Sequence, residues 1–495
     1  MKNAEHLSEK NLDSISNKVI KPSYDRKAVD IGIAHFGVGG FHRAHQALYT
    51  EEVLASGDLR WGICGIGITD RDKLMYDALK SQDYLYSLIA RGVDSEEARI
   101  IGSIIDYKIS ANSTKSIFDV LSSPATKIIS LTITEKAYPY KAESQEIDLD
   151  DLRIQQDIKN IDEPKTVIGY LVKALNQIRH NKDQIPPTIL CCDNVPQNGD
   201  MLRNLVSGLA HEIDCGLESY IRDRVLFPNT MVDRITPTTS AKHTLDFQEK
   251  YGIIDNHPVF CEDFRQWIVE NKFTKERPEW ELGGARFVES AKPYEKMKIR
   301  LLNGSHSALA YLSYLIGFKY VDDAVLDLDV QGFVKGYMNE ITPSVGKVPG
   351  IDLSEYKNKL VERFSNSAIK DTVIRLAEDG SRKIPNMIVE PLVDLLSSKL
   401  PTNHVAFALA CWIRFLEGDD ESKAHIEIVD PLKDLLTEKA QLCKNNAVPF
   451  LSTKQLFPES VSKNEAFANT VSRYLNEIRS KGSRAALRQF LQECK

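Results

Sequence analysis

Three polar side chains that can carry proton-transfer chemistry stand close together in the stretch KIRLLNGSH, residues 298–306. At about 100° per residue, Lys298, Asn303 and His306 fall within one half of an α-helix. Oxidation of a secondary alcohol requires a base for the hydroxyl proton and a donor for the developing oxyanion. A lysine whose pKa is lowered by desolvation can act as that base. The same spacing is also typical of a surface lysine beside an asparagine and a histidine that bond within their own helix.

A glycine-rich segment is a candidate site for the pyrophosphate of a dinucleotide. The expected strand Asp30–Phe36 runs into Gly37-Val38-Gly39-Gly40-Phe41, and an amphipathic stretch that predicts a helix follows. Gly37 would permit a tight turn, and Gly39 would let a pyrophosphate approach the backbone at the helix N-terminus. His42 stands where a third glycine normally allows close helix–strand packing. A glycine turn without a ligand is the alternative, but the strand–turn–helix context favours dinucleotide binding.

An acidic residue that could read the ribose of that dinucleotide follows the next expected strand. Trp61–Ile68 ends at Thr69-Asp70, which is farther from the glycines than the usual spacing of about 20 residues. Asp70 would accept a hydrogen bond from the ribose 2′-hydroxyl and repel a 2′-phosphate, which predicts NAD rather than NADP. Arg71 is compatible with a phosphate, and Asp70 is also a suitable N-cap for the following helix.

The composition is that of a globular protein with a sizeable core. The chain has 495 residues, of which 42% are hydrophobic and 27% charged, and this length favours two or three domains. A net charge of −7 gives no indication of a nucleic-acid or anionic-membrane partner. The first thirty residues lack an apolar core of signal-peptide length, and the most apolar stretches are far shorter than a membrane span. We therefore expect a cytoplasmic protein.

The cysteines and histidines do not form a recognisable metal-binding pattern. The eight cysteines are irregularly spaced without a C-x-x-C pair, which predicts buried, reduced thiols rather than disulfides or a zinc site. His42 and His45 are spaced for one helical face, but two ligands are too few for such a site. No metal is expected.

The first part of the chain alternates apolar β-rich runs with helical stretches. Because several of the runs are continuously apolar, they suit a parallel sheet that is buried on both faces. The alternation predicts a Rossmann-like, doubly wound α/β domain over residues 30–287, after an N-terminal extension of residues 1–29. The remaining predicted strands are 84–90, 99–109, 127–134, 187–194, 225–227 and 258–261, and helices are predicted over 167–179 and 200–213.

The character of the sequence changes near Phe287, and from Pro293 to the end there is almost no strand signal, which predicts a mainly helical domain over 288–495. The prolines, Pro343 among them, are expected to lie between the helices, where helices break. The predicted helices cover residues 298–318, 327–339, 353–364, 369–376, 388–397, 405–416 and 465–494.

Five blocks carry a resemblance to a known family. KIRLLNGSH resembles the catalytic signature of the polyol-specific long-chain dehydrogenases, the mannitol dehydrogenase family. GVGGFHRAHQ at residues 37–46 resembles the family's cofactor loop, including the histidine in place of the third glycine. CDNVPQNG at 192–199, FPNTMVDRITP at 227–237 and RLAEDGSRKIP at 375–385 resemble further blocks. The similarity spans about residues 30–400, in the order and at spacings like those of the family.

The resemblance implies a role for each matching residue. Lys298 would be the general base, Asn194 and Asn303 would form the oxyanion hole, and His306 would orient the reacting oxygen. Asp233, Arg375 and Lys383 match positions that bind the remaining substrate hydroxyls. Taken singly, Asp233 could instead pair with Arg234, and Arg375 and Lys383 could form a solvated helical face.

The family implies a metal-free, NAD-dependent interconversion of a polyol and its ketose, with D-mannitol and D-fructose the first choice. A hexuronate reductase acting on fructuronate/mannonate or tagaturonate/altronate is the near alternative, because such enzymes share the fold and the lysine signature. A nicotinamide-binding protein without catalysis is the distant alternative. The expected partner is a small molecule, with neither nucleic acid nor membrane, and the expected assembly is a monomer or a weak homo-oligomer.

Overall fold

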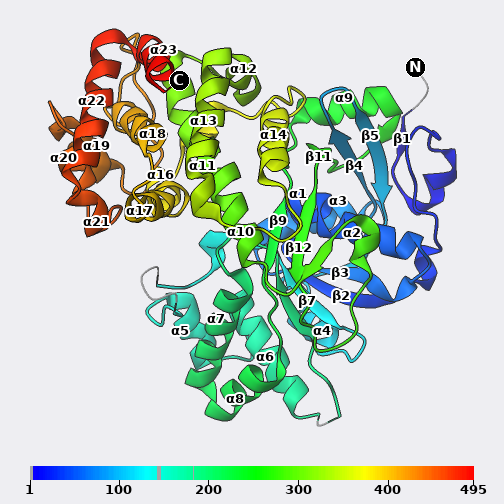
Figure 1. Cartoon of the computed structure of the whole chain (residues 1–495). Coiled ribbons are helices and arrows are strands. Elements are labelled where there is room, and N and C mark those ends of the chain that lie inside the picture. Colours follow the sequence, from blue (N-terminus) through cyan, green and yellow to red (C-terminus); the bar gives the residue numbers. More distant parts are fainter. Residues whose placement is uncertain (1–3, 142–145, 182, 495) are drawn as a thin grey trace. The chain divides into compact units, whose positions relative to one another are not determined.

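The computed structural model describes residues 4–141, 146–181 and 183–494. The chain divides into two compact units, with the boundary between Lys292 and Pro293. The first unit carries the strands, and the second is built from helices (Figure 1). The predicted fold class, a Rossmann-like domain followed by a mainly helical one, is therefore confirmed.

The centre of the first unit is a five-stranded parallel sheet. Its strand order is β6-β3-β2-β7-β8, so the order reverses between β2 and β7. In the ladder, Phe36 of β2 pairs with Leu131 of β7, which pairs with Cys191 of β8. The carboxyl ends of these three strands therefore lie at one edge, where open α/β sheets bind ligands. The strands are β2 Ile31–Phe36, β3 Gly62–Gly67, β6 Ile104–Ile109, β7 Ile128–Leu131 and β8 Thr188–Cys191.

Alternating side chains of β2 enter two different hydrophobic cores. Ala34 and Phe36 pack in one core with Leu171, which lies on α6 (Val167–Arg179). Ile33 packs in the other with Trp61 and Trp267. Because successive side chains of a strand point to opposite faces, both faces of the sheet are covered. This accounts for the continuously apolar sequence of the central strands.

Shorter sheets flank the central one. Their strand orders are β11-β4-β5, β13-β12-β9 and β1-β10. The N-terminal segment belongs to the first unit, since Leu7, Ile15 and Val19 are buried in a core with Phe247 and Phe260. The strands are β1 Glu5–His6, β4 Tyr86–Arg91, β5 Glu96–Ile101, β9 Thr230–Asp233, β10 Ile253–Ile254, β11 Val259–Glu262, β12 Gln266–Glu270 and β13 Arg286–Val288.

Two strand predictions were wrong in detail. Residues 99–109 form two strands in different sheets, because Glu51 binds the N–H of Gly102 and Arg26 binds its carbonyl, in place of ladder partners. Residues 225–227 form no strand: Ile189 N–H donates to Leu226 O, but Pro228 has no N–H with which to continue the pairing. The strand in this block is β9.

The helices of the first unit connect the strands. The predicted helix over 167–179 is confirmed with the same bounds. The helices are α1 Gly40–Ala44, α2 Gln46–Ala55, α3 Asp70–Lys80, α4 Thr114–Leu121, α5 Leu152–Lys159, α6, α7 Asn198–Ile213, α8 Cys215–Arg224 and α9 Ala241–Tyr251, with 3₁₀ turns η1 Glu9–Ser14, η2 Arg26–Ala28, η3 Leu59–Trp61, η4 Glu135–Ala137 and η5 Trp280–Gly283.

The helices of the second unit differ from the prediction in several places, two of which are at Pro343 and Gly482. Pro343 lies inside α13, in its last turn, where it removes a single backbone donor. The predicted helix 465–494 is broken at Gly482, whose φ of 81° is left-handed. The helices are α10 Lys292–Met297, η6 Lys298–Asn303, α11 Gly304–Ile316, α12 Val321–Leu326, α13 Leu328–Val345, α14 Leu353–Phe364, α15 Val373–Ala377, α16 Gly380–Ile384, η7 Pro385–Val389, α17 Glu390–Ser397, α18 Asn403–Phe415, α19 Lys433–Leu442, α20 Val448–Leu451, α21 Glu459–Ser462, α22 Glu465–Lys481 and α23 Ser483–Glu493.

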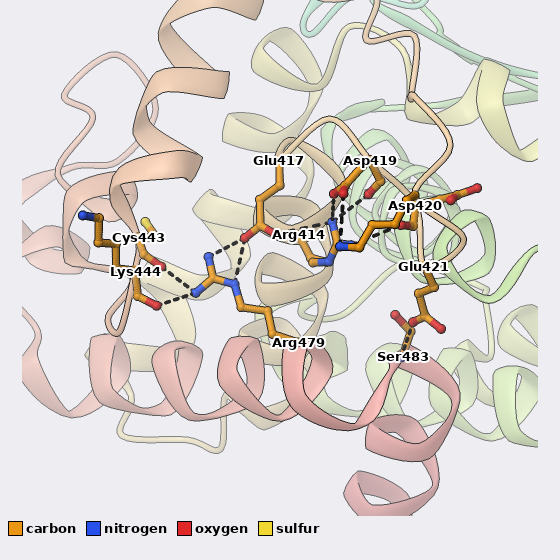
Figure 2. A network of polar contacts seen from close by, with 10 residues as sticks. Arg414, Glu417, Asp419, Asp420, Glu421, Cys443, Lys444, Arg479 and Ser483 are labelled. Atoms are coloured by element: carbon orange, nitrogen blue, oxygen red, sulfur yellow. Dashed lines mark hydrogen bonds and ion pairs between the residues drawn. The ribbon is translucent and has the colours of Figure 1, made fainter.

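A polar network joins the C-terminal helices to the loop after α18 (Figure 2). Arg479 of α22 donates through Nε to Glu417 at 2.8 Å and through Nη1 to the carbonyl of Cys443 at 2.6 Å. Arg414, at the end of α18, donates to Asp419 O at 2.7 Å. The charge-assisted bond between Arg479 and Glu417 connects this loop to α22, and the bond from Arg414 to Asp419 O holds the loop to the end of α18.

All eight cysteines are free, as predicted, and only Cys215 and Cys494 are exposed. In the described parts of the chain, the helices are too short or too polar to cross a membrane.

Candidate functional site

The glycine turn after β2 has the geometry that a dinucleotide loop requires. Gly37 has a φ of 89°, and a Cβ on it would lie 2.1 Å from Thr132 O, so only glycine fits. A Cβ on Gly39 would meet nothing closer than 3.9 Å, which leaves space beside this backbone. Gly39 N–H donates to Gly37 O at 2.7 Å. The turn is thus tight on one side and open on the other.

Side chains of β2 and the loop after β7 hold the carbonyl of Gly37. Thr132 Oγ1 donates to Gly37 O at 2.8 Å, and His35 Nε2 lies 2.9 Å from the same hydroxyl. His35 Nδ1 lies 2.8 Å from Ser130 Oγ, which donates to Gln46. The glycine turn is therefore anchored to β7, its neighbour in the sheet.

The histidine in place of the third glycine changes the helix that follows. The His42 ring is fully buried and stacks on His35 with 3.4 Å between ring centroids. Burial lowers the pKa of His42, so the ring is neutral. The predicted single helix is divided at His45 (φ −124°, ψ −96°), because α1 ends at Ala44 and α2 begins at Gln46. The bulky ring thus accompanies a break in the helix.

Asp70 is available to a ligand because its neighbours cap the helix. Thr69 is the N-cap of α3, and Asp72 Oδ2 accepts from Ile68 N–H at 2.9 Å and Thr69 N–H at 2.8 Å. Asp70 is exposed on the first turn. It also lines a cavity of about 990 Å³ with Ser110 and Thr114. The alternative role of Asp70 as the helix cap is therefore wrong.

Two residues predicted for the site, Asn194 of the oxyanion hole and Asp233 of the substrate-binding set, lie at or just after the ends of strands of the first unit. Asn194 is exposed just beyond β8, and Asp233 is buried at the end of β9, where it pairs with Gln266 of β12. Arg234, the alternative partner of Asp233, donates to Ala44 O at 2.6 Å and Glu262 O at 3.0 Å. These bonds fix Arg234 to the backbone of neighbouring elements.

Lys298 begins a π-helical turn rather than the predicted α-helix. Gly304 N–H donates to Ile299 O, a bond between residues five apart. In an α-helix the equivalent bond joins residues four apart, so the π turn brings a residue five positions on closer to the same face. The α-helical wheel used for the prediction therefore overestimated the angle between the side chains of Lys298 and Asn303 around the helix axis. π turns are rare and are frequent at functional sites.

The π turn presents the predicted catalytic groups in contrasting surroundings. Lys298 is 7% exposed, whereas Asn303 and His306 are partly exposed. Asn303 Oδ1 is buried and has no hydrogen-bond partner among the residues that the structure describes. The His306 ring packs on Phe364, with 4.2 Å between centroids. The second unit therefore contains a shielded lysine, a carboxamide and an imidazole that packs on an aromatic ring, all on neighbouring turns.

The two cationic residues predicted to bind substrate, Arg375 and Lys383, differ in their surroundings. The Arg375 guanidinium binds both carboxylate oxygens of Asp371, through Nε at 2.6 Å and through Nη2. Lys383 is half-buried on α16, and burial lowers the pKa of its ammonium although Asp379 opposes the shift. Arg375 is thus paired with Asp371, and its side chain is 59% exposed.

In residues 4–141, 146–181 and 183–494, no three His, Cys, Asp or Glu side chains are grouped as metal ligands.

Asp193, which the sequence did not single out, is 7% exposed and accepts several hydrogen bonds. Its position directly before Asn194, within the block CDNVPQNG at the end of a strand, was the available signal.

Comparison with known proteins identifies the family. Residues 31–282 match the family model of the mannitol dehydrogenase Rossmann domain, and residues 290–479 match that of the mannitol dehydrogenase C-terminal domain. The chain belongs to the mannitol dehydrogenase family.

Relatives cover nearly the whole chain. The structure of Pseudomonas fluorescens mannitol 2-dehydrogenase in ternary complex with NAD and D-mannitol is 38% identical, with a TM-score of 0.88, over 99% of this chain and all of that one. Mannitol 2-dehydrogenase of Aspergillus fumigatus is 36% identical over 98% of this chain and 99% of the relative. D-mannonate oxidoreductase of Escherichia coli is 36% identical over 94% of this chain and 97% of the relative.

The position of Asp70 predicts its effect on cofactor choice. Asp70→Ala should lower the preference for NAD over NADP about tenfold, because one charge-assisted hydrogen bond of about 1.5 kcal/mol is lost and repulsion of the 2′-phosphate disappears. Steady-state rates with both cofactors measure the ratio. Asp72→Ala is the control, and should lower the melting temperature without changing the ratio. An unchanged ratio in Asp70→Ala would show that another residue reads the ribose.

Proposed function

We propose that the chain is an NAD-dependent oxidoreductase that interconverts a polyol and its ketose, with D-mannitol and D-fructose the first choice. The observation that carries the proposal is the π turn of this family member, which places buried Lys298 and the carboxamide of Asn303 towards one face. A base and a donor are the groups that alcohol oxidation needs. Residues 30–287 would bind the cofactor, and 288–495 would supply the base.

The glycine turn and the Asp70 cavity suit NAD. The backbone from Gly37 to Phe41, with Val38 and Gly40, would hold the pyrophosphate in the open space beside Gly39. Asp70 would accept from the adenosine ribose at the edge of the cavity of about 990 Å³. When bound, NAD supplies the acceptor for the hydride of the alcohol.

The protein's own groups would manage the proton and the oxygen. Lys298 Nζ would take the hydroxyl proton in oxidation and return it in reduction. Asn194 and Asn303 would donate to the oxygen as negative charge develops on it, and His306 would orient that oxygen, with its ring held against Phe364. The reaction needs no metal, because Lys298 supplies the base and the carboxamides supply the donors.

The charge around Arg375 favours an uncharged substrate over a uronate. A carboxylate is bound best by a free bidentate guanidinium, but two donors of Arg375 already bind Asp371. In this proposal the remaining N–H groups of Arg375, together with Lys383 and Asp233, would supply the mixed donors and acceptors that hydroxyls need. Hexuronate reduction is the second candidate, since D-mannonate oxidoreductase is as similar in sequence as the fungal mannitol 2-dehydrogenase.

Removal of the base should abolish turnover selectively. Lys298→Ala is expected to lower kcat by about 10³-fold or more, within the range of a lost general base, while NADH still binds. Stopped-flow and steady-state rates, with NADH binding followed by fluorescence, measure the two effects. The matched control is Lys296→Ala in the preceding helix α10; its ammonium lies 3.7 Å from Asp394 and its side chain is more exposed. Near-normal turnover of Lys298→Ala would remove this lysine from the mechanism.

The substrate assignment predicts the order of specificity constants. With NADH, kcat/KM for fructose should exceed that for fructuronate and tagaturonate by at least about tenfold. Asp371→Asn frees the Arg375 guanidinium, so this variant should improve the use of the two uronates relative to fructose. Oxidation of NADH followed by absorbance gives all the rates. A higher kcat/KM for fructuronate in the wild type would reverse the assignment, and no turnover of any of these sugars would favour a non-catalytic protein.

A further inference from the structure

A buried carboxylate ties together two loops at the carboxyl edge of the central sheet. Asp193 Oδ1 accepts from Thr134 N–H at 2.8 Å, and Oδ2 accepts from Ile133 N–H at 3.0 Å and from Tyr138 Oη at 2.6 Å. The three donors belong to the segment after β7, whereas Asp193 follows β8. Both oxygens are therefore occupied by donors from a neighbouring loop.

The loop that Asp193 holds contains a strained residue. Thr134 has a φ of 71° and a ψ of 151°, a conformation that is almost confined to glycine. For a β-branched residue such a conformation costs about 1–3 kcal/mol and persists only when the surroundings impose it. The bond from Thr134 N–H to Asp193 is the contact that acts directly on this peptide.

The backbone of Asp193 is fixed as well. Asn198 Nδ2 donates to Asp193 O at 3.0 Å and to Thr230 O, on β9, at 3.1 Å. Asp193 O belongs to the peptide that joins Asp193 to Asn194. That peptide is thus held through Asn198 on one side and through the Asp193 carboxylate on the other.

The same segment also reaches the glycine turn. Thr132 Oγ1 holds Gly37 O at 2.8 Å, two residues before strained Thr134. Residues 132–134 therefore connect the turn after β2 to the peptide that carries Asn194. All these contacts lie within the first unit.

We propose that Asp193 is a positioning residue, which sets the carboxamide of Asn194 relative to the glycine turn by holding residues 133 and 134. This inference rests on the proposed role of Asn194 as a donor to the reacting oxygen. In this proposal Asp193 acts on turnover through the position of Asn194 and not through a contact of its own with substrate or cofactor. The bonds from Thr132 to Gly37 and between His35 and Thr132 do not involve Asp193, so we expect cofactor binding to survive its replacement.

Asp193→Asn tests this role by removing one acceptor. The NH₂ group of the asparagine then faces a backbone N–H or the Tyr138 hydroxyl, which are donors in the wild type. The hydrogen bonds that hold residues 133 and 134 are therefore lost. We expect kcat for fructose reduction at saturating NADH to fall about 10–100-fold, the size of the effect of a misplacement of about 1 Å. NADH affinity, measured by fluorescence, should stay within about twofold. Asp255→Asn is the matched control, because Asp255 is a buried carboxylate that accepts from Ser87 N–H and His257 N–H in another part of this unit. It should lower the melting temperature and leave kcat unchanged.

A double-mutant cycle separates positioning through Asn194 from general loosening. In an Asn194→Ala background, Asp193→Asn should lower kcat by less than about twofold further, because the group that it positions is gone. An equal loss in both backgrounds, or wild-type kcat in folded Asp193→Asn, overturns the proposal. Wild-type kcat in Asn194→Ala alone instead overturns the role proposed for Asn194.

Two more variants keep the test independent of folding. Glycine at position 134 adopts the observed conformation without strain. Adding Thr134→Gly to Asp193→Asn should therefore raise kcat at least about fivefold above that of Asp193→Asn alone. No recovery of kcat would contradict the proposal that Asp193 acts by holding residues 133 and 134. Tyr138→Phe removes a single bond to Asp193 and should lower kcat about threefold, with the same dependence on Asn194. This milder variant decides the question by the same criteria if Asp193→Asn does not fold.

Discussion

The hydrogen bond from Gly304 N–H to Ile299 O fixes the register on which the proposed chemistry depends. It makes residues 298–303 a π turn, so that Lys298 and Asn303, five residues apart, approach one face of the helix. The turn is braced from the opposite side by Arg300, which donates to Ser344 O at 2.7 Å and to Asp394 at 2.6 Å. The proposed base and the carboxamide thus share a π-helical turn that is held by bonds to neighbouring elements.

In the first unit, irregular backbone segments lie at the carboxyl edge of the regular central sheet and require specific support. Its turns after β2, β7 and β8 contain the left-handed Gly37 and the strained Thr134. Side-chain hydrogen bonds compensate for the lost ladder bonds: Thr132 holds the turn after β2, and buried Asp193 holds the turns after β7 and β8. Such conformations are stable only where polar partners over-determine them, which is why function concentrates there.

The sequence was sufficient for features that follow from periodicity or from a single steric requirement. The continuously apolar strands, the glycine turn at Gly37, and helices such as 167–179 and 353–364 all appear as predicted. The break at His45 and the π turn could not be predicted from the sequence, because both depend on tertiary packing around residues that are compatible with an ordinary helix. The pairing of Asp371 with Arg375 was accessible from their i,i+4 spacing. By contrast, the strain at Thr134 depends on an aspartate far away in sequence.

Gly304 offers the most direct test of the π turn. A Cβ on Gly304 would lie 2.8 Å from Met387 O of η7 and 2.9 Å from the Tyr337 hydroxyl, so alanine must push the turn away from its support. Gly332 in α13 is the control, since its Cβ would meet only Leu491 methyl groups at 3.7 Å and 3.8 Å. The account predicts that Gly304→Ala lowers kcat for fructose reduction at least about tenfold, with NADH binding retained and Gly332→Ala unchanged. Wild-type kcat in Gly304→Ala would contradict it.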